Sequence, residues 1–582
     1  MKFRITFPCS LGLALCIASP AAGAGTRYVN GALTTGNNDG SSWSDAYRDP
    51  DAVAVALAAA VPGDEIWVAA GTYVPTTTTT RTLSHALANG VALYGGFAGG
   101  ETLREQRDPA LHVTILSGDI GAAAVNTDNS YHVVDAAGMG ASAILDGFTI
   151  TLGHSESATP LAERFGGGLR CVGGAGPTIR NCRFVNNFAW GQGGGVYLEL
   201  CAPVFTDCTF ENNAAPAGGG AFCRTTSVTF ERCTFSGGGA MDGAGLWISE
   251  NFSPPGGPPR ILNSLIVGNN GTFVGGILSG ADTEIQNCTI AFNTNSSSTS
   301  TTAGIVANPG VTIVNCIVYY NGPLGGPHTS AHQLSGTSAV TYSLVEGGFA
   351  GTGNSGDNPR FASGEFRLTI GSPAIDAGDN TAVPAGSTLD LARRPRFSDE
   401  PAVPDTGIGS APIVDIGAFE GAVPQLRAFC FGNGAGVPCP CGNDAPPMSG
   451  NGCANSTGNA GRLDAEGRAT LTGDTLVLRG SSMTDGACLY FQGSTAIAAG
   501  RGAVFGDGLL CVSGNLVRLW TVANVGGASQ VPPAGGPPVH TLGHVTLIGS
   551  VRYYQAWYRD AVAFCTADGW NLTNGIWVRW DW

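Results

Sequence analysis

Residues 166–187 read GGGLRCVGGAGPTIRNCRFVNN, a glycine-rich step into a short apolar strand followed by a second strand centred on a polar-Cys pair. This two-part phrase occurs six times before residue 320. The first half recurs as GGGVYLEL at Gly193, GGGAFCRT at Gly218, GAGLWIS at Gly243, GGILSG at Gly275 and AGIVAN at Ala303. The second half recurs as FTDCTF at Cys208, FERCTF at Cys233, ILNSLI at Ser264, IQNCTI at Cys288 and IVNCIV at Cys316. Steps of 24 to 31 residues are typical of a stack in which each repeat contacts only its neighbours.

Each half of the repeat is interpreted as a strand, because it is short, alternates in polarity and is bounded by Gly, Asn or Pro. Aligned halves form columns of small, aliphatic or aromatic residues. The first strand contributes Leu169, Val196, Ala221 and Leu246, then Cys171, Leu198, Cys223 and Ile248; the second contributes Phe184, Phe210, Phe235, Ile266, Ile290 and Val318. Parallel strands about 4.8 Å apart would stack these columns into a dry core. The pattern predicts an all-β chain built around a parallel β-helix.

A glycine-rich stretch followed by the motif F-x-x-N occurs at Phe184–Asn187 and Phe210–Asn213. The same motif with another apolar residue in place of Phe starts at Ile266, Ile290 and Val318. These motifs resemble right-handed parallel β-helix proteins, and most of all the repeats of bacterial polymorphic outer-membrane proteins. The resemblance implies a right-handed coil of the pectate-lyase-like fold, which polysaccharide-degrading enzymes share. Because one fold hosts many activities, the resemblance alone selects none of them.

The start of the chain has the pattern of a secretory signal peptide over residues 1–24. Lys2 and Arg4 precede an apolar run, and Ala22-Gly23-Ala24 supplies small residues for cleavage. Residues 25–140 are expected to form an N-terminal cap and the first coils, with a short helix in DPDAVAVALAAA covering the open end of the coil. Residues 141–361 are expected to form the repeats. Asp146 and His154 within them fit turns and strands better than catalysis.

Residues 362–421 contain FRLTIGSPAIDAGDN, DLARRPRF and VDIGAFE, and they resemble the terminal segment of many secreted bacterial β-helix proteins. These three stretches contain four aspartates, Asp376, Asp379, Asp390 and Asp415. Their oxygens would suit calcium, but they would equally cap turns and pair with Arg393, Arg394 and Arg396. The structural interpretation is preferred, so no metal ligand and no cofactor are assigned.

Residues 429–582 have frequent Cys, Pro and Gly between short apolar stretches. They resemble a C-terminal module of secreted proteins from environmental bacteria. Short strands such as Thr475–Arg479, Leu516–Val522 and Val545–Gly549 predict a small β-sandwich. Its seven cysteines are expected to form disulfides that connect loops, and the odd number leaves one cysteine without a partner in this module. The eight cysteines of the coil are instead expected to be buried thiols, because directly stacked parallel strands offer poor disulfide geometry.

The composition excludes several classes of function. The 582 residues include 89 glycines, 12% charged residues and a formal net charge of −15. Lys2 is the only lysine, so a chain without its leader has no lysine for a Schiff base or a phosphate-binding loop. The acidic balance argues against nucleic acid as a partner. No apolar stretch of about 18 residues follows the leader, so no transmembrane segment is expected and the protein is predicted to be secreted, extracellular or at the cell surface.

If the columns point inward, the residues between them face outward, and Tyr197, Phe222 and Trp247 then form a ribbon of rings one coil apart. Exposed aromatic faces suit sugars, so these three residues are the predicted ligand-binding site. Two arrangements stay open: the ribbon is exposed, or the loop of residues 153–165 or the C-terminal module covers it.

Catalytic candidates beside the ribbon are Glu199, Arg170 and Arg224, and an ordinary surface ion pair explains them equally well. Glycoside hydrolysis requires two carboxylates, and this face offers only Glu199. The predicted function is therefore non-enzymatic binding or adhesion, with a polysaccharide or another cell-surface component as partner. The alternatives are a polysaccharide lyase or glycoside hydrolase, and a purely structural envelope protein.

Overall fold

The computed structural model describes residues 24–580, with gaps at 157, 159, 250–255, 281, 298–301, 337–338, 363–365, 401–402, 422–425, 435, 447–448, 472, 548, 561 and 563. The predicted signal peptide lies outside the described residues apart from Ala24. The chain divides into two units, Met1–Pro359 with Asp376–Glu420, and Arg360–Ile375 with Gly421–Trp582. Within the described ranges, none of the helices combines the length and the apolar character needed to cross a membrane.

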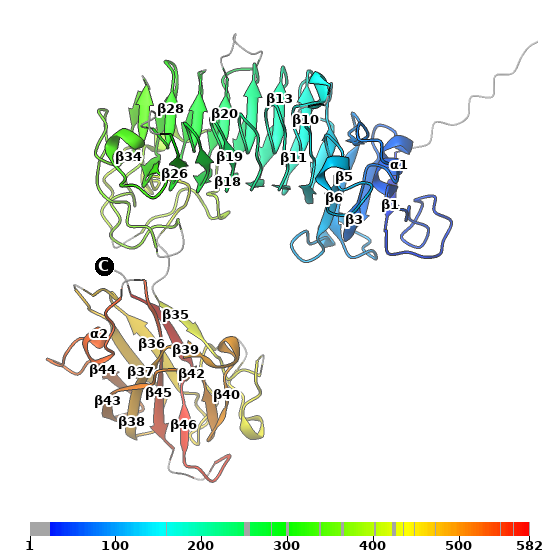
Figure 1. The fold of residues 1–582 in the computed structure, drawn as a ribbon. Helices are drawn as coiled ribbons and strands as arrows, with labels where there is room; N and C mark the ends of the chain where they lie inside the picture. The colour runs from blue at the N-terminus through cyan, green and yellow to red at the C-terminus, as the bar shows by residue number, and fades with distance from the viewer. Residues whose placement is uncertain are drawn as a thin grey trace, which may run out of the picture. The chain divides into compact units, whose positions relative to one another are not determined.

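The first unit is a coil of short strands in which each turn adds one strand to each of three long parallel sheets (Figure 1). The 11-stranded sheet contains β1 (Thr26–Val29), β2 (Glu65–Ala69), β5 (Ala92–Phe97), β8 (Ile144–Asp146), β11 (Thr178–Arg180), β14 (Val204–Thr206), β17 (Thr229–Glu231), β21 (Arg260–Leu262), β25 (Glu284–Gln286), β29 (Thr312–Val314) and β33 (Ala339–Thr341). The 10-stranded sheet contains β3 (Gly71–Tyr73), β6 (Thr114–Ser117), β9 (Phe148–Thr151), β12 (Arg183–Val185), β15 (Thr209–Glu211), β18 (Thr234–Ser236), β22 (Leu265–Val267), β26 (Thr289–Ala291), β30 (Ile317–Tyr319) and β34 (Leu344–Val345).

The third long sheet and a short fourth one complete the coil. The 9-stranded sheet contains β4 (His85–Ala86), β7 (Val134–Asp135), β10 (Leu169–Val172), β13 (Val196–Glu199), β16 (Ala221–Arg224), β20 (Leu246–Ile248), β24 (Ile277–Ser279), β28 (Ile305–Ala307) and β32 (Leu334–Gly336). The 4-stranded sheet contains β19 (Gly239–Ala240), β23 (Asn270–Gly271), β27 (Thr294–Asn295) and β31 (Gly322–Pro323). The all-β parallel coil predicted from the repeat is thus confirmed.

The strand register stacks the predicted inward columns directly on one another. Leu169 pairs with Val196, which pairs with Ala221 on the next coil. Phe210 stacks between the neighbouring rings at centroid distances of 5.0 Å to Phe184 and 4.4 Å to Phe235. All of these side chains are buried in one continuous core. The eight coil cysteines are buried free thiols, as expected from the sequence.

The glycines that open each repeat are required by close approach between coils. A Cβ added at Gly195 would lie 2.4 Å from the carbonyl oxygen of Gly220, and one at Gly220 would lie 2.4 Å from that of Gly245. Real Cβ atoms do not tolerate such contacts with backbone, so only glycine permits the coils to stack here.

A sharp bend separates the 11-stranded sheet from the 10-stranded sheet in each coil. The residue at this bend has left-handed backbone geometry, with φ of 51° at Asn181, 57° at Asp207 and 49° at Asn263. Asn and Asp adopt this conformation more readily than other non-glycine residues. This requirement accounts for the polar residue that precedes Cys or Ser in the second half of the repeat.

The asparagine of the F-x-x-N motif forms a buried ladder along the coil. Asn293 Nδ2 donates to Asn321 Oδ1 at 2.9 Å and to the carbonyl oxygen of Ile266 at 2.9 Å. Asn293 Oδ1 accepts from both the backbone amide and the side-chain amide of Asn269, at 3.1 and 2.9 Å. One side chain therefore satisfies buried polar groups of three successive coils.

Replacing Asn293 by alanine is expected to lower the free energy of unfolding of the coil by about 3 kcal/mol, because it leaves several buried donors and acceptors without partners at about 1–3 kcal/mol each. Urea-induced unfolding of the variant would measure the loss. The exposed Asn270 on the preceding coil is the matched control, and Asn270→Ala should change stability by less than about 0.5 kcal/mol. Equal effects of the two substitutions would contradict a structural role for the ladder.

Helices are few and short. The predicted cap helix is present as α1 (Ala52–Ala59), whose residues Ala52, Val53, Ala56 and Leu57 are buried in the core of the coil. The others are α2 (Val539–Leu542), η1 (Arg104–Gln106), η2 (Asn126–Asp128), η3 (Leu161–Glu163), η4 (Ser330–His332), η5 (Asn380–Ala382), η6 (Pro440–Gly442) and η7 (Ile497–Gly500).

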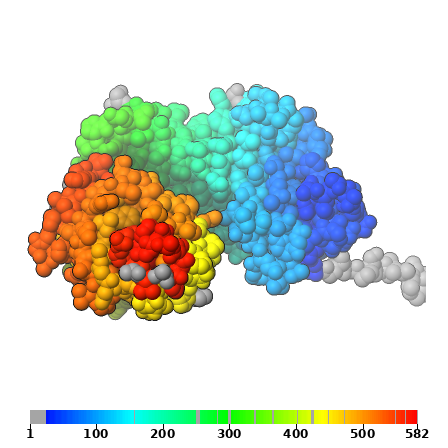
Figure 2. Space-filling model, turned by 90° about the horizontal axis from the view of Figure 1, so that it is seen from below, coloured from blue at the N-terminus to red at the C-terminus, as the bar shows by residue number. Residues whose placement is uncertain are grey.

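The second unit contains antiparallel sheets, as predicted, and its surface is yellow to red in Figure 2. The largest sheet contains β35 (Leu426–Phe429), β47 (Gly575–Arg579), β45 (Val551–Arg559), β38 (Gly486–Gly493), β43 (Val517–Asn524) and β46 (Trp570–Leu572). Smaller sheets contain β36 (Arg462–Glu466), β37 (Val477–Ser481) and β44 (Ser529–Val531); β39 (Thr495–Ala496) and β42 (Val512–Ser513); and β40 (Ala503–Phe505) and β41 (Gly508–Leu510). Side chains from the two largest sheets share one core.

One predicted strand of this unit is wrong. The described residues of Val545–Gly549 form no strand, and β45 starts only at Val551. Positive φ values at His544 and Gly549, 50° and 74°, turn the chain at both ends of the apolar stretch. Val545 is nevertheless buried in the core, so its hydrophobic character reflects packing rather than strand pairing.

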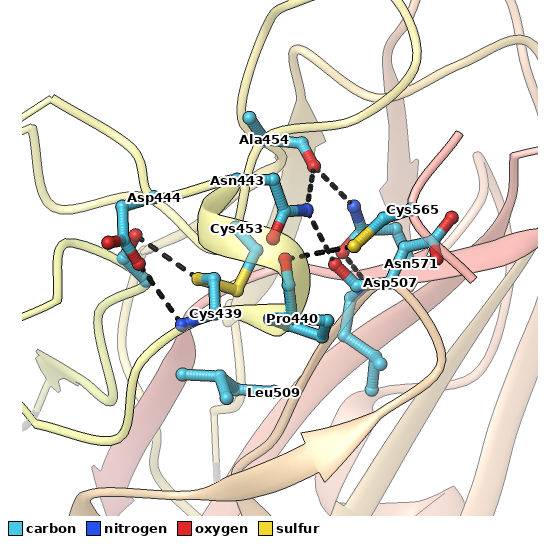
Figure 3. Close-up of a disulfide and its surroundings, with 12 residues drawn as sticks. Cys439, Pro440, Asn443, Asp444, Cys453, Ala454, Asp507, Leu509, Cys565 and Asn571 are labelled. Atoms are coloured by element: carbon cyan, nitrogen blue, oxygen red, sulfur yellow. Dashed lines mark hydrogen bonds between the residues drawn. A yellow bond between two sulfur atoms is a disulfide. The ribbon is translucent and has the colours of Figure 1, made fainter.

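Six of the seven cysteines in the second unit form disulfides, Cys430–Cys511, Cys439–Cys453 and Cys441–Cys565, and Cys488 is a buried free thiol. Figure 3 shows the surroundings of Cys439–Cys453, where Asn443 Nδ2 donates to the carbonyl oxygens of Ala454 at 2.7 Å and Asp507 at 2.9 Å. The covalent and hydrogen-bonded links join loops far apart in sequence, as the cysteine pattern predicted.

Candidate functional site

The three rings of the predicted ribbon stack along the 9-stranded sheet. Tyr197 and Phe222 lie parallel at a centroid distance of 5.7 Å, and Trp247 meets Phe222 edge-on at 5.4 Å. The register pairs Tyr197 with Phe222 and Phe222 with Trp247 on successive coils. The sequence therefore located the column correctly.

Most of this ribbon is covered. Phe165, at the end of the loop of residues 153–165, stacks on Tyr197 at 4.9 Å. Tyr197 and Phe222 are each only 2% exposed, and Trp247 is partly buried against the same cluster. Burial and a hydrogen bond to Glu199 raise the pKa of Tyr197 to about 12. Of the two arrangements left open by the sequence, the structure has the end of the loop packed over Tyr197, so the ribbon is not an open platform along its whole length.

The catalytic candidates beside the ribbon are engaged in separate ion pairs. Glu199 accepts from the Tyr197 hydroxyl at 3.0 Å and lies 3.4 Å from Arg224. Arg170 instead lies 3.6 Å from Asp135 on the preceding coil. The structure therefore does not gather Glu199, Arg170 and Arg224 around one point.

A groove of about 790 Å³ lies elsewhere on the first unit, beside the start of the coil. Strand ends of the 11-stranded sheet, the segment around η1 and the terminal segment line it. Its charged lining residues are Arg104, Arg107, Arg180, Arg183 and Arg393, together with Glu105, Asp108, Asp146 and Asp207. Arginine is thus the dominant side chain of the groove.

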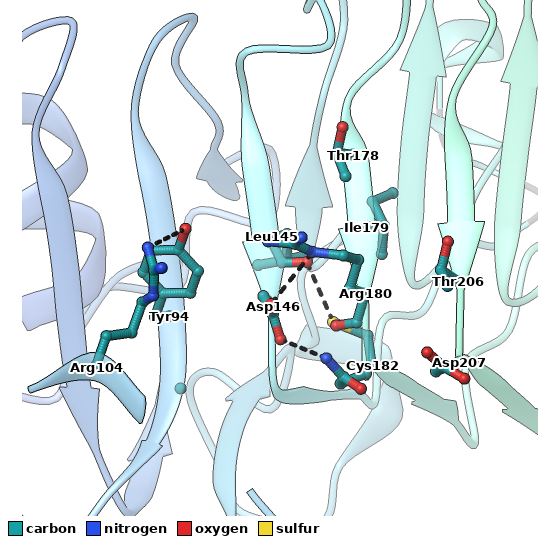
Figure 4. A network of polar contacts seen from close by, with 12 residues as sticks. Tyr94, Arg104, Leu145, Asp146, Thr178, Ile179, Arg180, Cys182, Thr206 and Asp207 are labelled. Carbon is teal, nitrogen blue, oxygen red and sulfur yellow. Dashed lines mark hydrogen bonds and ion pairs between the residues drawn. The ribbon is translucent and has the colours of Figure 1, made fainter. Parts of the chain in front are cut away.

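Asp146 holds two of the arginines in place, as Figure 4 shows in part. It is 2% exposed, and its carboxylate lies 2.8 Å from Arg107 and 3.3 Å from Arg180. Asn181 Nδ2 also donates to it at 2.8 Å. A buried carboxylate needs such partners, so Asp146 fixes the orientation of both guanidinium groups.

Asp207 has the same role two coils further along, after β14. Its two oxygens receive a bidentate ion pair from Arg232 at 2.8 and 3.1 Å. Arg393 of the terminal segment also lies 3.2 Å from Asp207 and donates to Asn181 Oδ1. The terminal segment therefore contributes a guanidinium group to a wall that the coil forms.

Tyr94 anchors the opposite end of the groove. The guanidinium carbons of Arg104 and Arg107 lie 4.9 and 5.1 Å from the centre of its ring, within cation–π range. Arg104 also donates to the Tyr94 hydroxyl at 3.2 Å and pairs with Glu65 at 2.8 Å. The wall is therefore rigid around these side chains.

The arginines at the centre of the groove keep donors for a ligand. Arg180 and Arg183 expose 40% and 55% of their side chains. Each guanidinium offers five N–H donors, and the ion pairs to Asp146 and Glu211 each use one nitrogen. Fixed and partly exposed guanidinium groups are suited to carboxylate or sulfate groups.

Sequence reasoning missed this groove. Asp146 and Arg393 were noted only as structural residues, and the other arginines were not singled out. A usable signal was the register within the repeat, because Asp146 pairs directly with Arg180 across β8 and β11. No local signal places Arg393 beside Asp207, which lies 186 residues away in sequence.

A family model matches part of the coil. Residues 125–254 match the family model described as "Right handed beta helix region". The crystal structure of pectate lyase Pel9A is similar at 15% sequence identity, covering 69% of this chain and 97% of that chain with a TM-score of 0.38. A TM-score this low says nothing about activity, and no curated protein matches the chain. The matched stretch lies within the coil of stacked parallel strands, so the first unit has a parallel β-helix fold and residues 125–254 are similar to the right-handed β-helix family.

Proposed function

We propose that the first unit binds an acidic polysaccharide in the arginine groove and does not cleave it. The observation that carries this proposal is the contrast between the acids and the bases of the groove. Asp146 and Asp207 are each paired with two arginines, whereas Arg180 and Arg183 each use only one nitrogen in an ion pair and expose 40% and 55% of their side chains. The groove is therefore organised to receive negative charge.

The groove also suits an extended chain. It joins residues of β5, β8, β11 and β12, together with the segment after β14, so its lining crosses several coils. A polymer with a carboxylate on each sugar could meet successive guanidinium groups along this path. Charge-assisted hydrogen bonds of this kind are worth about 1.5–3 kcal/mol each.

The predicted export of the protein is part of the proposal. Three disulfides in the second unit are typical of an oxidising compartment. The N-terminal residues have the pattern of a signal peptide. We therefore place the acidic polysaccharide outside the cell or at the cell surface.

Binding to polygalacturonate, an acidic polymer, is expected to be measurable in low salt and to weaken at least tenfold when the salt is raised from 50 to 500 mM, since salt screens exposed charges. A neutral galactan should not bind under either condition. Affinity electrophoresis in gels that contain each polymer would measure both. Equal retardation by the neutral polymer would contradict recognition by the arginines.

The main alternative is a polysaccharide lyase or hydrolase. Hydrolysis requires two available carboxylates. The buried Asp146 and the half-buried Asp207 are each paired with two arginines. Of the other two acids, Glu105 lies 3.4 Å from Arg104 and Asp108 accepts from the amides of Ala110 and Leu111. Prolonged incubation of the protein with polygalacturonate and calcium should leave the polymer length unchanged. Shortened chains or unsaturated uronate products would overturn the non-enzymatic proposal and favour the alternative.

A further inference from the structure

The terminal segment of the first unit contains an aspartate that differs from its neighbours. Asp390 accepts from the backbone amides of Arg394 and Glu420 at 2.7 and 2.8 Å. Asp379 accepts from the amide of Thr381 at 2.8 Å, and Asp415 from that of Asp376 at 2.8 Å. These three carboxylates cap turns, as the structural interpretation of the sequence requires.

Asp376 is the exception. The residue is fully buried, and neither of its carboxylate oxygens has a hydrogen-bond partner of ordinary geometry among the described residues. Burying an ionised carboxylate without a partner costs free energy, and a bound cation would offset that cost.

Two further carboxylates meet Asp376. One oxygen from each of Asp376, Asp399 and Asp405 lies within 4.8 Å of the others. Calcium binds oxygen ligands at about 2.3–2.6 Å, so opposite ligands of one ion lie up to about 5 Å apart. The three oxygens therefore fit around one calcium ion.

The backbone presents these carboxylates in a fixed arrangement. The Asp376 carbonyl accepts from the amides of Thr406 and Gly407 at 2.8 and 3.1 Å, directly after Asp405. Its own amide donates to Asp415, and its φ of 50° is in the left-handed region. The turn that carries Asp376 is thus tied on both sides while its side chain stays unpaired.

We propose that Asp376, Asp399 and Asp405 form a calcium site that joins Asp399 and Asp405 to the turn at Asp376. The set contains neither His nor Cys, which zinc and copper prefer, and three oxygen donors suit a hard cation. Asp399 and Asp405 are exposed, so water completes the 6–8 ligands of the ion. The site does not depend on the arginine groove.

Calorimetric titration of the full chain with calcium chloride, after removal of metals with EDTA, tests the proposal. One ion should bind with a Kd of about 10⁻⁴ M, a value common among extracellular calcium modules. Asp405→Asn, at an exposed position that should not disturb folding, should weaken binding at least tenfold, and Asp376→Asn should do the same. Glu400→Gln removes an acid from the same loop outside the ligand set and should change the affinity less than twofold.

Three results would overturn the site. They are an absence of calcium binding by the wild-type chain, equal losses in Glu400→Gln and Asp405→Asn, and binding of magnesium as tight as that of calcium. Thermal unfolding gives a second readout, because calcium should raise the Tm of wild type and Glu400→Gln but not of Asp405→Asn. Loss of polygalacturonate binding in groove variants would leave these results unchanged, so the two proposals fail separately.

Discussion

Replacing Phe210 by alanine is expected to lower the free energy of unfolding of the coil by about 4 kcal/mol, within the range for removing a buried phenylalanine. The Phe210 ring lies between Phe184 and Phe235, nearly parallel to both. It also meets the edges of Phe205 and Phe230 at 5.7 and 5.8 Å. Since all five rings are buried, the cavity cannot fill without shifting strands of adjacent coils.

Hydrogen exchange of peptides from residues 166–320, measured with increasing urea, would assign the loss to the coil. Because coils of a stack stabilise their neighbours, protection should fall on the coils before and after Phe210 as well. Phe397 in the terminal segment of the same unit is 42% exposed and serves as the control. A loss below about 1 kcal/mol for Phe210→Ala, or one equal to that of Phe397→Ala, would contradict the packed aromatic core.

Removal of the Cys430–Cys511 disulfide by a double alanine substitution is expected to lower the stability of the second unit by about 4 kcal/mol. The two cysteines are separated by 81 residues, so the bond removes much conformational entropy from the unfolded chain. Removal of Cys439–Cys453, with a separation of 14 residues, should cost about 3 kcal/mol. Both pairs are buried in one cluster, which makes their packing environments comparable.

Urea-induced unfolding of the two double variants and the wild type would compare these losses. Peptides from residues 429–580 should lose protection from hydrogen exchange, whereas peptides from the coil should not change. A larger loss for the Cys439–Cys453 variant would contradict an origin in loop closure. Unchanged stability in both variants would contradict the assignment of structural disulfides.

The repeat predicted the coil well because its information is local and periodic. Each of Leu169, Val196 and Ala221 occupies the same position in its own coil, so alignment of the repeats alone places them in one column. The same logic placed Tyr197, Phe222 and Trp247 in an outward column. Periodicity fixes which side of a strand a residue faces and carries no information about what covers that face.

The cover over the ribbon, the arginine groove and the proposed calcium site all depend on segments outside the repeat, and this is why the sequence did not reveal them. Phe165 covers Tyr197 from a loop with no counterpart in the other coils. Arg393 reaches Asp207 from the terminal segment. The sequence shows Asp376 as one of several aspartates whose oxygens would suit calcium, but the approach of Asp399 and Asp405 to it becomes visible only when the following loop is placed in space.

Binding of polygalacturonate to groove and ribbon variants in low salt tests the proposed function most directly. The double variant Arg180→Ala, Arg183→Ala removes the two exposed groove arginines and should weaken binding at least tenfold, since each charge-assisted hydrogen bond contributes about 1.5–3 kcal/mol. Trp247→Ala, in the ribbon, and Arg260→Ala, a partly exposed, ion-paired arginine outside the groove lining, should each bind within twofold of wild type. Undiminished binding by the groove variant, or a loss confined to Trp247→Ala, would contradict the arginine groove as the site.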